Sequence, residues 1–396
     1  MKPLQVCHLG KYYPPAAGGI ETHVRTLARA QAELGARVRV LCVNHEEGPT
    51  SFEADGSVEV TRLRRVSSAM KLDLCPGLLG RLRRVEADIL HLHVPNPTMI
   101  LALLAARPRP PLVVTYHSDV IHQRLRAVLF RPLERLAYRR VRAILPTSPV
   151  YPGGSTFLRA HADRIQVLPI GIDVEPYVRP SVENLTRAAA IREAHARGGP
   201  LWLCTGRFVY YKGFINAVRA LRHVEGRLLM IGDGPNQGEL LAEAHRLGVS
   251  DRIDFLGKMP SYLDVVPFYL AADAFWFPSN ARSEAFGLVQ VEAMASGCPV
   301  INTRIPHSGV PWVSPHEETG LTVPINDPQA LASAARRLLT DPALRCRLID
   351  AARRRAVSEF DHRVMAERCL AIYRGVLARA GVEGQTERPI LIPSSL

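Results

Sequence analysis

Short apolar runs alternate with helical patterns along almost the whole chain, and this alternation constrains the fold more than any other feature. Runs of this length, bounded by turn residues, predict strands buried on both faces of a sheet. Strands that alternate with helices predict a parallel sheet covered by helices, an α/β fold. The predicted strands are Gln5–Leu9, Val38–Val43, Ile89–Leu92, Leu112–Tyr116, Ala143–Pro146 and Gln166–Pro169, then Leu201–Thr205, Arg227–Ile231, Ile253–Leu256, Ala274–Phe277, Pro299–Asn302 and Leu321–Val323.

The two series of strands are separated by a segment that predicts a domain boundary. Residues 176–200 begin with two prolines and end in Gly198-Gly199-Pro200, which is typical of a linker followed by a helix. We therefore expect two Rossmann-like domains, at residues 1–180 and 181–360. A last helix is expected at about 360–380, followed by a loose tail at 381–396.

The composition excludes several classes of protein. Hydrophobic residues make up 47% and charged residues 22% of the 396 residues, which is typical of a globular chain. No apolar run reaches the roughly 18 residues of a membrane span, and the N-terminus predicts a strand instead of a signal peptide. The seven cysteines are scattered without a C-x-x-C pair, which favours reduced thiols and a cytoplasmic location.

Basic residues are concentrated in the first half of the chain. The net charge is +13, and residues 62–142 alone hold 16 Lys and Arg against 5 Asp and Glu. Within this region, residues 122–142 carry seven arginines beside an apolar stripe that is interrupted at Pro132. The pattern predicts either a core-facing helix with a solvated basic face or an amphipathic segment on an anionic membrane. A basic face can also serve nucleic acid or an anionic substrate.

Two glutamates with seven residues between them form the strongest candidate site. Glu284 is expected in a loop, and Glu292 in a helix that ends at Gly297. The N–H groups of residues 287–289 would be free at the start of this helix, where free N–H groups and the helix dipole bind phosphate. A carboxylate on each side of an anion site suits a nucleotide sugar, which has hydroxyls at both ends and a diphosphate in the middle.

Glycines and cations follow other predicted strands. Arg207 and Lys212 lie five positions apart after the strand at 201–205, and cations at a strand end suit a diphosphate. Gly18-Gly19 opens a helix after the first strand, where the backbone of an open α/β sheet approaches its ligand. The next two strands of the second series are followed by G-D-G-P at 232–235 and G-K-M-P at 257–260.

Histidines lie at the ends of two strands in the first series. His91 and His93 end one strand and His117 follows another, and doubly wound folds place their ligands at such ends. For His91 we favour a structural hydrogen bond. No helical H-x3-H and no suitably spaced carboxylate supports a metal site, and the sequence contains no Asp-x-Asp. We therefore expect neither a metal nor a cofactor.

These motifs together resemble the retaining GT-B glycosyltransferases of glycosyltransferase family 4. The resemblance covers nearly the whole chain. It implies two Rossmann-like domains that face a central cleft, with the last helix packed back on the N-terminal domain. The motifs that carry it are E-x7-E at 284–292, G-R-x4-K-G at 206–213, G-x-G-P at 232–235, P-x-x-G-G-x-E at 15–21 and H-S-D at 117–119.

The resemblance also implies a role for each residue of the site. Glu292 would hold the ribose hydroxyls, whereas Glu284 would contact the donor sugar. His117 would touch the donor sugar at the reacting centre, and His93 would lie on the acceptor side. The remaining donor-binding residues, for the diphosphate and the nucleobase, would be Gly18, Gly19, Arg207, Lys212, Gly232, Lys258, Met259, Phe286, Gly287, Leu288 and Val289.

A further resemblance narrows the expected substrate. Residues 305–313, together with Y-H-S-D at 116–119, resemble bacterial mannosyl- and rhamnosyltransferases of surface polysaccharide assembly. This implies a retaining, metal-independent enzyme that moves a hexose from GDP-mannose or a related GDP sugar to a lipid-linked or glycan acceptor, at the inner face of an anionic membrane. Two alternatives stay open, a nucleotide-sugar epimerase and a basic nucleic-acid-binding protein. Because the arginines are not interleaved with exposed aromatic residues, we expect no nucleic-acid partner.

Overall fold

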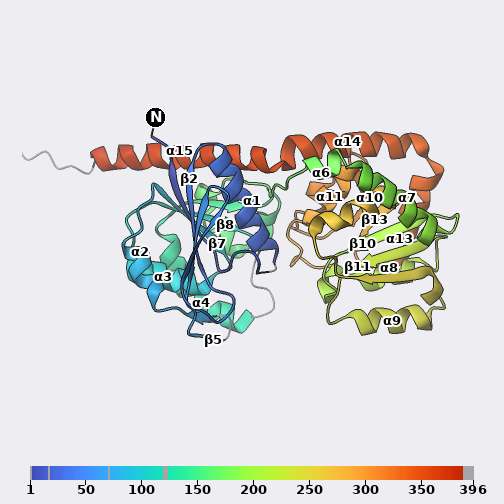
Figure 1. Ribbon diagram of the computed structural model, residues 1–396, viewed down its shortest axis with the longest axis horizontal. Coiled ribbons are helices and arrows are strands. Elements are labelled where there is room, and N and C mark those ends of the chain that lie inside the picture. Colours follow the sequence, from blue (N-terminus) through green and yellow to red (C-terminus); the bar gives the residue numbers. More distant parts are fainter. Residues whose placement is uncertain (1, 17, 70–71, 119–123, 387–396) are drawn as a thin grey trace, which may run out of the picture. The chain divides into compact units, whose positions relative to one another are not determined.

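The chain folds into two compact units (Figure 1). The computed structural model describes residues 2–16, 18–69, 72–118 and 124–386. The chain changes unit between Leu168 and Pro169, ahead of the linker at which the sequence places the boundary. The N-terminal unit comprises Met1–Pro146, Ala160–Leu168 and Arg363–Leu396, and the C-terminal unit comprises Thr147–Arg159 and Pro169–His362.

The N-terminal unit is built on a seven-stranded sheet. Its strands are β1 (Gln5–Leu9), β2 (Arg37–Val43), β3 (Ser51–Asp55), β4 (Val58–Leu63), β7 (Ile89–Val94), β8 (Leu112–Tyr116) and β9 (Val141–Pro146). They lie in the order β3-β4-β2-β1-β7-β8-β9, and all pairs are parallel except β3 with β4. A separate small hairpin joins β5 (Ser67–Ala69) to β6 (Leu72–Leu74).

The strand predictions for this unit were wrong at two places. The β3–β4 hairpin was missed, because no residue of β3 is buried and no apolar run marks it. The strand predicted at 166–169 is not formed. The N–H groups of Gln166 and Leu168 donate to the carbonyls of Ile144 and Pro146 at the end of β9, at 2.9 and 3.0 Å. β9 itself ends at Pro146, and the chain leaves this unit at Pro169, so the pairing is too short to form a strand.

Five helices of the N-terminal unit accompany the sheet within the described ranges. They are α1 (Gly19–Glu33), α2 (Gly77–Arg83), α3 (Pro97–Ala106), α4 (Arg124–Tyr138) and α15 (His362–Thr386). The apolar stripe of α1 is buried, and Gly35 follows its end with a φ of 87°, as the sequence predicts. Pro132 lies inside α4, so the interruption that it was expected to cause does not end this helix.

The C-terminal unit is built on a six-stranded, fully parallel sheet. Its strands are β10 (Leu201–Thr205), β11 (Arg227–Ile231), β12 (Ile253–Gly257), β13 (Ala274–Phe277), β14 (Val300–Thr303) and β15 (Gly320–Val323). They lie in the order β12-β11-β10-β13-β14-β15. The helices are α5 (Thr156–Arg159), α6 (Glu175–Val178), α7 (Val182–Ala196), α8 (Phe214–Ala220), α9 (Gln237–Arg246), α10 (Val266–Ala271), α11 (Leu288–Ser296), α12 (Val310–Val313), α13 (Pro328–Thr340) and α14 (Pro342–Phe360).

Helices cover both faces of this second sheet. Leu203 of β10 belongs to one buried cluster, together with Met294 of α11, whereas its neighbour Trp202 belongs to another, together with Val218 of α8. Successive side chains of a strand point to opposite faces, so this division assigns α11 and α8 to opposite sides of the sheet. Both faces are therefore dry, and polar side chains concentrate where the strands end.

The last helix, α15, packs on the sheet of the N-terminal unit. Its buried residues Met365, Leu370 and Val376 share a cluster with Val6 of β1 and Val113 of β8. The helix continues to Thr386, so the expectation of a loose tail from residue 381 is wrong for its first residues. Residues 387–396 lie outside the described residues. Within the described ranges, no helix is both long enough and apolar enough to cross a membrane.

Tyr373 of α15 generates a test of this packing. Its hydroxyl lies 2.5 Å from Nδ1 of His91 and accepts from Nε2 of Gln31 at 3.3 Å. Tyr373→Phe should destabilise the N-terminal unit by roughly 1–3 kcal/mol, because buried polar atoms lose their partners. Urea unfolding measures the effect. Tyr262→Phe, at a side chain that is 58% exposed, is the control, and equal unfolding midpoints for the two variants would contradict the prediction.

Candidate functional site

Glycines at the carboxyl edge of the C-terminal sheet allow its loops to pack backbone against backbone. Gly206 follows β10, Gly232 follows β11 and Gly257 ends β12. The N–H of Gly232 donates to the carbonyl of Gly257 at 2.8 Å. A Cβ atom on Gly232, whose φ is +139°, would lie 2.0 Å from the carbonyl oxygen of Gly206. Any other residue at 232 would therefore push these loops apart.

Lys212 and Glu284, both predicted from the sequence, come together in this unit. The Lys212 Nζ atom lies 2.7 Å from Oε2 of Glu284, and the two side chains are only 12% and 11% exposed. The ammonium group also lies over the ring of Phe277, 5.0 Å from its centroid. An ion pair with so little water around it is stronger than a surface pair and holds its geometry.

The loop that carries Glu284 is fixed by residues 305–313, which the sequence marked only through a resemblance. The hydroxyl of Ser308 donates to the carbonyl of Glu284. The N–H of Gly309 donates to the carbonyl of Ala285 at 2.9 Å, and a Cβ atom at Gly309 would lie 2.6 Å from that same oxygen. The segment at 305–313 therefore supports the glutamate loop, a role that no local sequence pattern reveals.

The helix that was predicted between the two glutamates is present as α11. It begins after Gly287, whose φ is 78°, and ends at Gly297, whose φ is 75°. Phe286 is buried and packs edge-on against Phe360, with 5.7 Å between the ring centroids. The N–H groups of Leu288 and Val289 stand in the first turn of the helix and have no acceptor within it. They are available to an anion, as the sequence predicts.

Glu292 lies inside α11 and is held by a tyrosine that sequence reasoning missed. The hydroxyl of Tyr269, on α10, donates to Oε2 of Glu292 at 2.9 Å. Desolvation raises the pKa of Glu292 to about 7, against the lowering effects of that hydrogen bond and of Lys212. Tyr269 also contacts the hydroxyl of Thr205 at 3.2 Å, so it connects Glu292 to the end of β10.

The other predicted residues of this unit differ in burial. Arg207 and Lys258 are exposed, whereas Met259 is half-buried and packs against the same cluster as Phe286. Burial first, and then the charge of Glu284, raise the pKa of Tyr211, whereas Lys212 and Arg207 lower it. All three of these charges therefore act on the Tyr211 hydroxyl, and Arg207 belongs to the same charged region as the Lys212–Glu284 pair.

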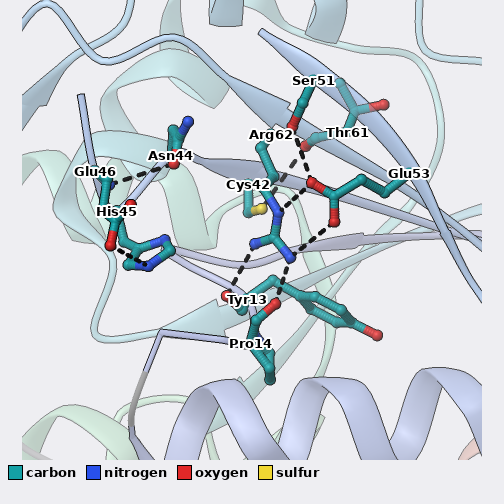
Figure 2. Close-up of polar contacts among 10 residues, drawn as sticks. All are labelled: Tyr13, Pro14, Cys42, Asn44, His45, Glu46, Ser51, Glu53, Thr61 and Arg62. Atoms are coloured by element: carbon teal, nitrogen blue, oxygen red, sulfur yellow. Dashed lines mark hydrogen bonds and ion pairs between the residues drawn. The ribbon is translucent and has the colours of Figure 1, made fainter. Parts of the chain in front are cut away.

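In the N-terminal unit, Gly18 and Gly19 open α1 as predicted. A Cβ atom on Gly19 would meet nothing within 4 Å, so the helix begins in open space. The loop before these glycines is anchored by Arg62 of β4 (Figure 2). Its guanidinium donates to the carbonyls of Tyr13, at 2.9 Å, and Pro14, and to Glu53 at 3.0 Å. Arg62 is 5% exposed, so it positions this loop and does not belong to a basic surface.

Five histidines from four segments of the N-terminal unit form one buried cluster. His91 has the structural role expected of it, because Nδ1 lies 2.5 Å from the Tyr373 hydroxyl and Nε2 lies 2.7 Å from Oγ1 of Thr115. The sequence predicted roles for His93 and His117 but gave no sign that other histidines join them. The members are His8 on β1, His23 on α1, His91 and His93 on β7, and His117 after β8.

A chain of hydrogen bonds orients three of these rings. His8 Nε2 lies 2.8 Å from Oε1 of Gln31, so it donates, and its Nδ1 is left as an acceptor. Nε2 of His93 lies 3.0 Å from that atom and therefore carries a proton. Nδ1 of His93 keeps its lone pair and lies 3.5 Å from Nε2 of His117.

Burial keeps these rings neutral. Desolvation lowers the pKa of His8 to about 4 and that of His117 to about 3, and it also lowers the pKa values of His23 and His93. At neutral pH each ring therefore offers one N–H donor and one lone pair. Asp119, the last residue of the H-S-D motif, lies outside the described residues.

Known proteins resemble both units of the chain. The family described as "Glycosyl transferases group 1" matches residues 188–355, and the "Glycosyl transferase 4-like domain" matches residues 18–171. The D-rhamnosyltransferase WbpZ of Pseudomonas aeruginosa is 32% identical over 343 residues, which cover 86% of this chain and 87% of that protein. The chain belongs to the glycosyltransferases. A second relative of this glycosyltransferase, the O-antigen chain mannosyltransferase C of Escherichia coli, is 31% identical over 373 residues, covering 92% of this chain and 96% of the relative.

Solved structures show that the glycosyltransferase has the GT-B fold. The crystal structure of Anabaena HepE in complex with UDP matches with a TM-score of 0.74, and covers 94% of this chain and all of that one at 21% identity. Sucrose-phosphate synthase from Thermosynechococcus elongatus matches with a TM-score of 0.76 over 95% of this chain, at 24% identity. The fold class expected from the sequence is therefore confirmed.

The raised pKa of Glu292 generates a stability test. Because this pKa of about 7 lies above the ~4.3 of a free glutamate, the folded glycosyltransferase favours the protonated acid, and ionisation becomes steadily more destabilising as the pH rises from about 4 to 7. Glu292→Gln removes this effect. Its stability relative to the wild type should therefore be higher at pH 8 than at pH 5, by on the order of 1–2 kcal/mol.

Urea unfolding at the two pH values measures that difference. Glu193→Gln, at an exposed position of α7, is the matched control and should give the same relative stability at both pH values. A Glu292→Gln variant whose relative stability does not change with pH would show that this carboxyl is not desolvated as described.

Proposed function

We propose that the glycosyltransferase moves a hexose from GDP-mannose or a related GDP sugar to a lipid-linked or glycan acceptor in polysaccharide or glycolipid biosynthesis, with retention at the anomeric carbon. The single observation that carries this proposal is the Lys212–Glu284 ion pair. Glu284 lies in the loop that leads into α11, whose first N–H groups have no acceptor within the helix. The names of the two relatives, a D-rhamnosyltransferase and an O-antigen chain mannosyltransferase, favour a GDP-linked deoxyhexose or hexose.

In this proposal the C-terminal unit binds the donor. Glu292 accepts hydrogen bonds from the ribose hydroxyls, and Lys258 and Met259 lie against the base. The backbone N–H groups at 286–289, before and in the first turn of α11, bind the distal phosphate, because a helix start offers unpaired donors and a favourable dipole. The half-buried position of Glu292 beside Tyr269 supports this role, since a carboxylate there meets a hydroxyl-rich ligand with little competing water.

Lys212 has two tasks in the proposed transfer: it binds the donor diphosphate beside Glu284, and it stabilises the diphosphate as it leaves. In the structure its ammonium group forms an ion pair with Glu284. A diphosphate that binds there would contact the same ammonium group, so Lys212 would interact with Glu284 and with the diphosphate at once. Arg207 and Lys212 then stabilise the leaving diphosphate electrostatically as the bond to the sugar breaks. Two cations and a helix start are sufficient for this task, and we therefore propose that transfer needs no metal ion.

The N-terminal unit supplies the sugar-side and acceptor contacts in the proposal. His117 contacts the donor sugar through its neutral ring, with His93 on the acceptor side and Gly18 and Gly19 beside the diphosphate. The neutral state of His117 supports this role, because a neutral imidazole both donates to and accepts from sugar hydroxyls.

We also propose that this unit docks on the inner face of an anionic membrane. On α4, Leu133 and Leu136 are 39% and 46% exposed, and Arg131 and Arg135 are exposed beside them. Exposed leucines between arginines are typical of a helix that lies in a membrane interface. A lipid-linked acceptor would be presented at such a surface.

Substitution of the donor cations tests the transfer. Arg207→Ala should lower kcat roughly a hundredfold with labelled GDP-mannose, because loss of one charge-assisted contact to a leaving group costs about 3 kcal/mol. Lys212→Ala should lower kcat at least as much. Arg222→Ala, at another exposed arginine of the same unit, is the control and should leave kcat unchanged. Wild-type activity that prefers UDP-sugars would refute the proposed GDP donor, and full activity in both site variants would remove these cations from the site.

Reversal of charge on α4 tests the membrane proposal. The wild type should sediment with vesicles that contain phosphatidylserine at low salt and leave them as salt rises, since each basic residue near the surface contributes about 1 kcal/mol before screening. A variant with Arg124, Arg126, Arg131 and Arg135 changed to glutamate should no longer bind. The matched control reverses four exposed arginines of the C-terminal unit, Arg187, Arg222, Arg347 and Arg354. Equal loss of binding in both variants would indicate only a dependence on net charge.

A further inference from the structure

Two groups of histidines in the N-terminal unit are compact enough to hold a metal ion. One is His8, His91 and His93, and the other is His23, His93 and His117, and within each group the candidate ligand atoms lie within 4.8 Å of one another. The first group is satisfied by the protein itself, because both ring nitrogens of His8 and both of His91 already have hydrogen-bond partners. In the second group, by contrast, neither ring nitrogen of His23 has a hydrogen-bond partner.

His23 is the residue that most needs an explanation. Its side chain is 1% exposed, and neither ring nitrogen has a hydrogen-bond partner. Its ring meets those of His93 and His117 edge-on, with centroids 5.5 and 4.8 Å away. A buried polar group without a partner typically destabilises a protein by about 1–3 kcal/mol. The His23 ring has two such atoms, so packing alone does not explain a histidine at this position.

His93 is oriented as metal-binding histidines usually are. Its Nε2 atom donates to His8, which in turn donates to Gln31, and Gln31 is held by Tyr373. A ligand histidine almost always donates its second ring nitrogen to such an outer partner, which fixes the ring and directs the lone pair at the metal. The remaining lone pair of His93, on Nδ1, lies on the side of His117.

The distances suit a tetrahedral ion with little adjustment. Zinc–nitrogen bonds of about 2.0–2.1 Å place tetrahedral nitrogens about 3.3 Å apart. The Nδ1 atom of His93 and the Nε2 atom of His117 are 3.5 Å apart. The candidate ligand atoms of all three histidines lie within 4.8 Å of one another, so His23 reaches the ion after a small side-chain rotation. Three histidines leave the fourth position of a tetrahedral ion for a water molecule.

We propose that His23, His93 and His117 form a binding site for one divalent transition-metal ion of the Zn²⁺ type. Imidazole ligands without carboxylates favour Zn²⁺, Co²⁺, Ni²⁺ and Cu²⁺ over Mg²⁺, Ca²⁺ and Mn²⁺. The ion takes no part in the proposed transfer. Because it occupies the lone pair with which His117 would contact the sugar, it acts as an inhibitor, a consequence that rests on the proposed function, whereas binding itself does not.

Titration of the metal-stripped full chain with Co²⁺ and with Zn²⁺ tests the site directly. Co²⁺ should give visible absorption bands typical of tetrahedral coordination, and calorimetry with Zn²⁺ should give one site per chain. Mg²⁺ should produce no heat at the same concentration. His23→Ala should weaken Zn²⁺ binding at least a hundredfold, and Gln31→Leu, which removes only the outer support, should weaken it about 10–100-fold.

Matched controls separate this site from adventitious binding. His245→Ala removes an exposed histidine of the C-terminal unit, and Cys346→Ser removes the one exposed cysteine of the described residues. Neither should change the affinity. Circular dichroism checks that each variant is folded, and Gln31→Leu keeps the test open if His23→Ala fails to fold. No saturable binding at micromolar Zn²⁺, or equal loss of binding in the control variants, would overturn the proposal.

Activity measurements then distinguish the site from its consequence. Zn²⁺ should inhibit transfer by the wild type at concentrations that fill the site, and EDTA should restore full activity. Filling of the site without inhibition would leave the site established and refute the sugar contact of His117. Loss of activity in EDTA that Zn²⁺ restores would overturn the statement that the ion takes no part in transfer.

Discussion

The parallel direction of the strands is the constraint on which the candidate site depends. In the C-terminal unit every strand ends at the same edge of the sheet, and the loops that leave β10, β11 and β12 meet there through glycine backbones. Lys212 follows β10 and Glu284 follows β13, and they reach one another because these two strands are neighbours in the sheet. The neighbouring start of α11 provides unpaired N–H groups at the same edge. The meeting of several loops at one edge of the sheet, and not the residues of any single loop, therefore brings cations, carboxylates and a helix start together.

Exclusion of water gives the two units different electrostatic characters. In the C-terminal unit, Lys212 and Glu284 form a nearly buried ion pair, whereas desolvation raises the pKa of Glu292, which accepts a hydrogen bond from Tyr269, to about 7. In the N-terminal unit, desolvation lowers the pKa values of His117 and its neighbours and keeps these rings neutral. One unit thus suits an anionic ligand, and the other suits hydroxyl groups or a metal ion that needs neutral imidazoles.

The sequence identified the polar side chains at the strand ends better than it identified the residues that hold them. Lys212, Glu284 and His117 follow strand ends, and that position is visible in a local pattern. Their supports are not visible: Tyr269 lies on another helix, Ser308 lies on a loop after β14, and Gln31 lies in the middle of α1. Arg62 illustrates the converse error, because its sequence neighbours suggested a basic surface, whereas the fold buries it under Tyr13 and Pro14.

By itself the sequence determined the class of the fold, most of the strands and the limits of α1 and α11, because hydrophobic periodicity and terminal glycines act over a few residues. It failed for β3, which has no buried residue, and for the segment at 166–169, whose two hydrogen bonds to the end of β9 do not form a strand. The packing of α15 on the N-terminal sheet was expected through the family resemblance alone, and only the tertiary structure decided that His23 lies beside His93 and His117. Such contacts join residues that are separated by many positions in sequence, and they are set by the order of strands in the sheet and by the burial of whole faces, which local patterns do not contain.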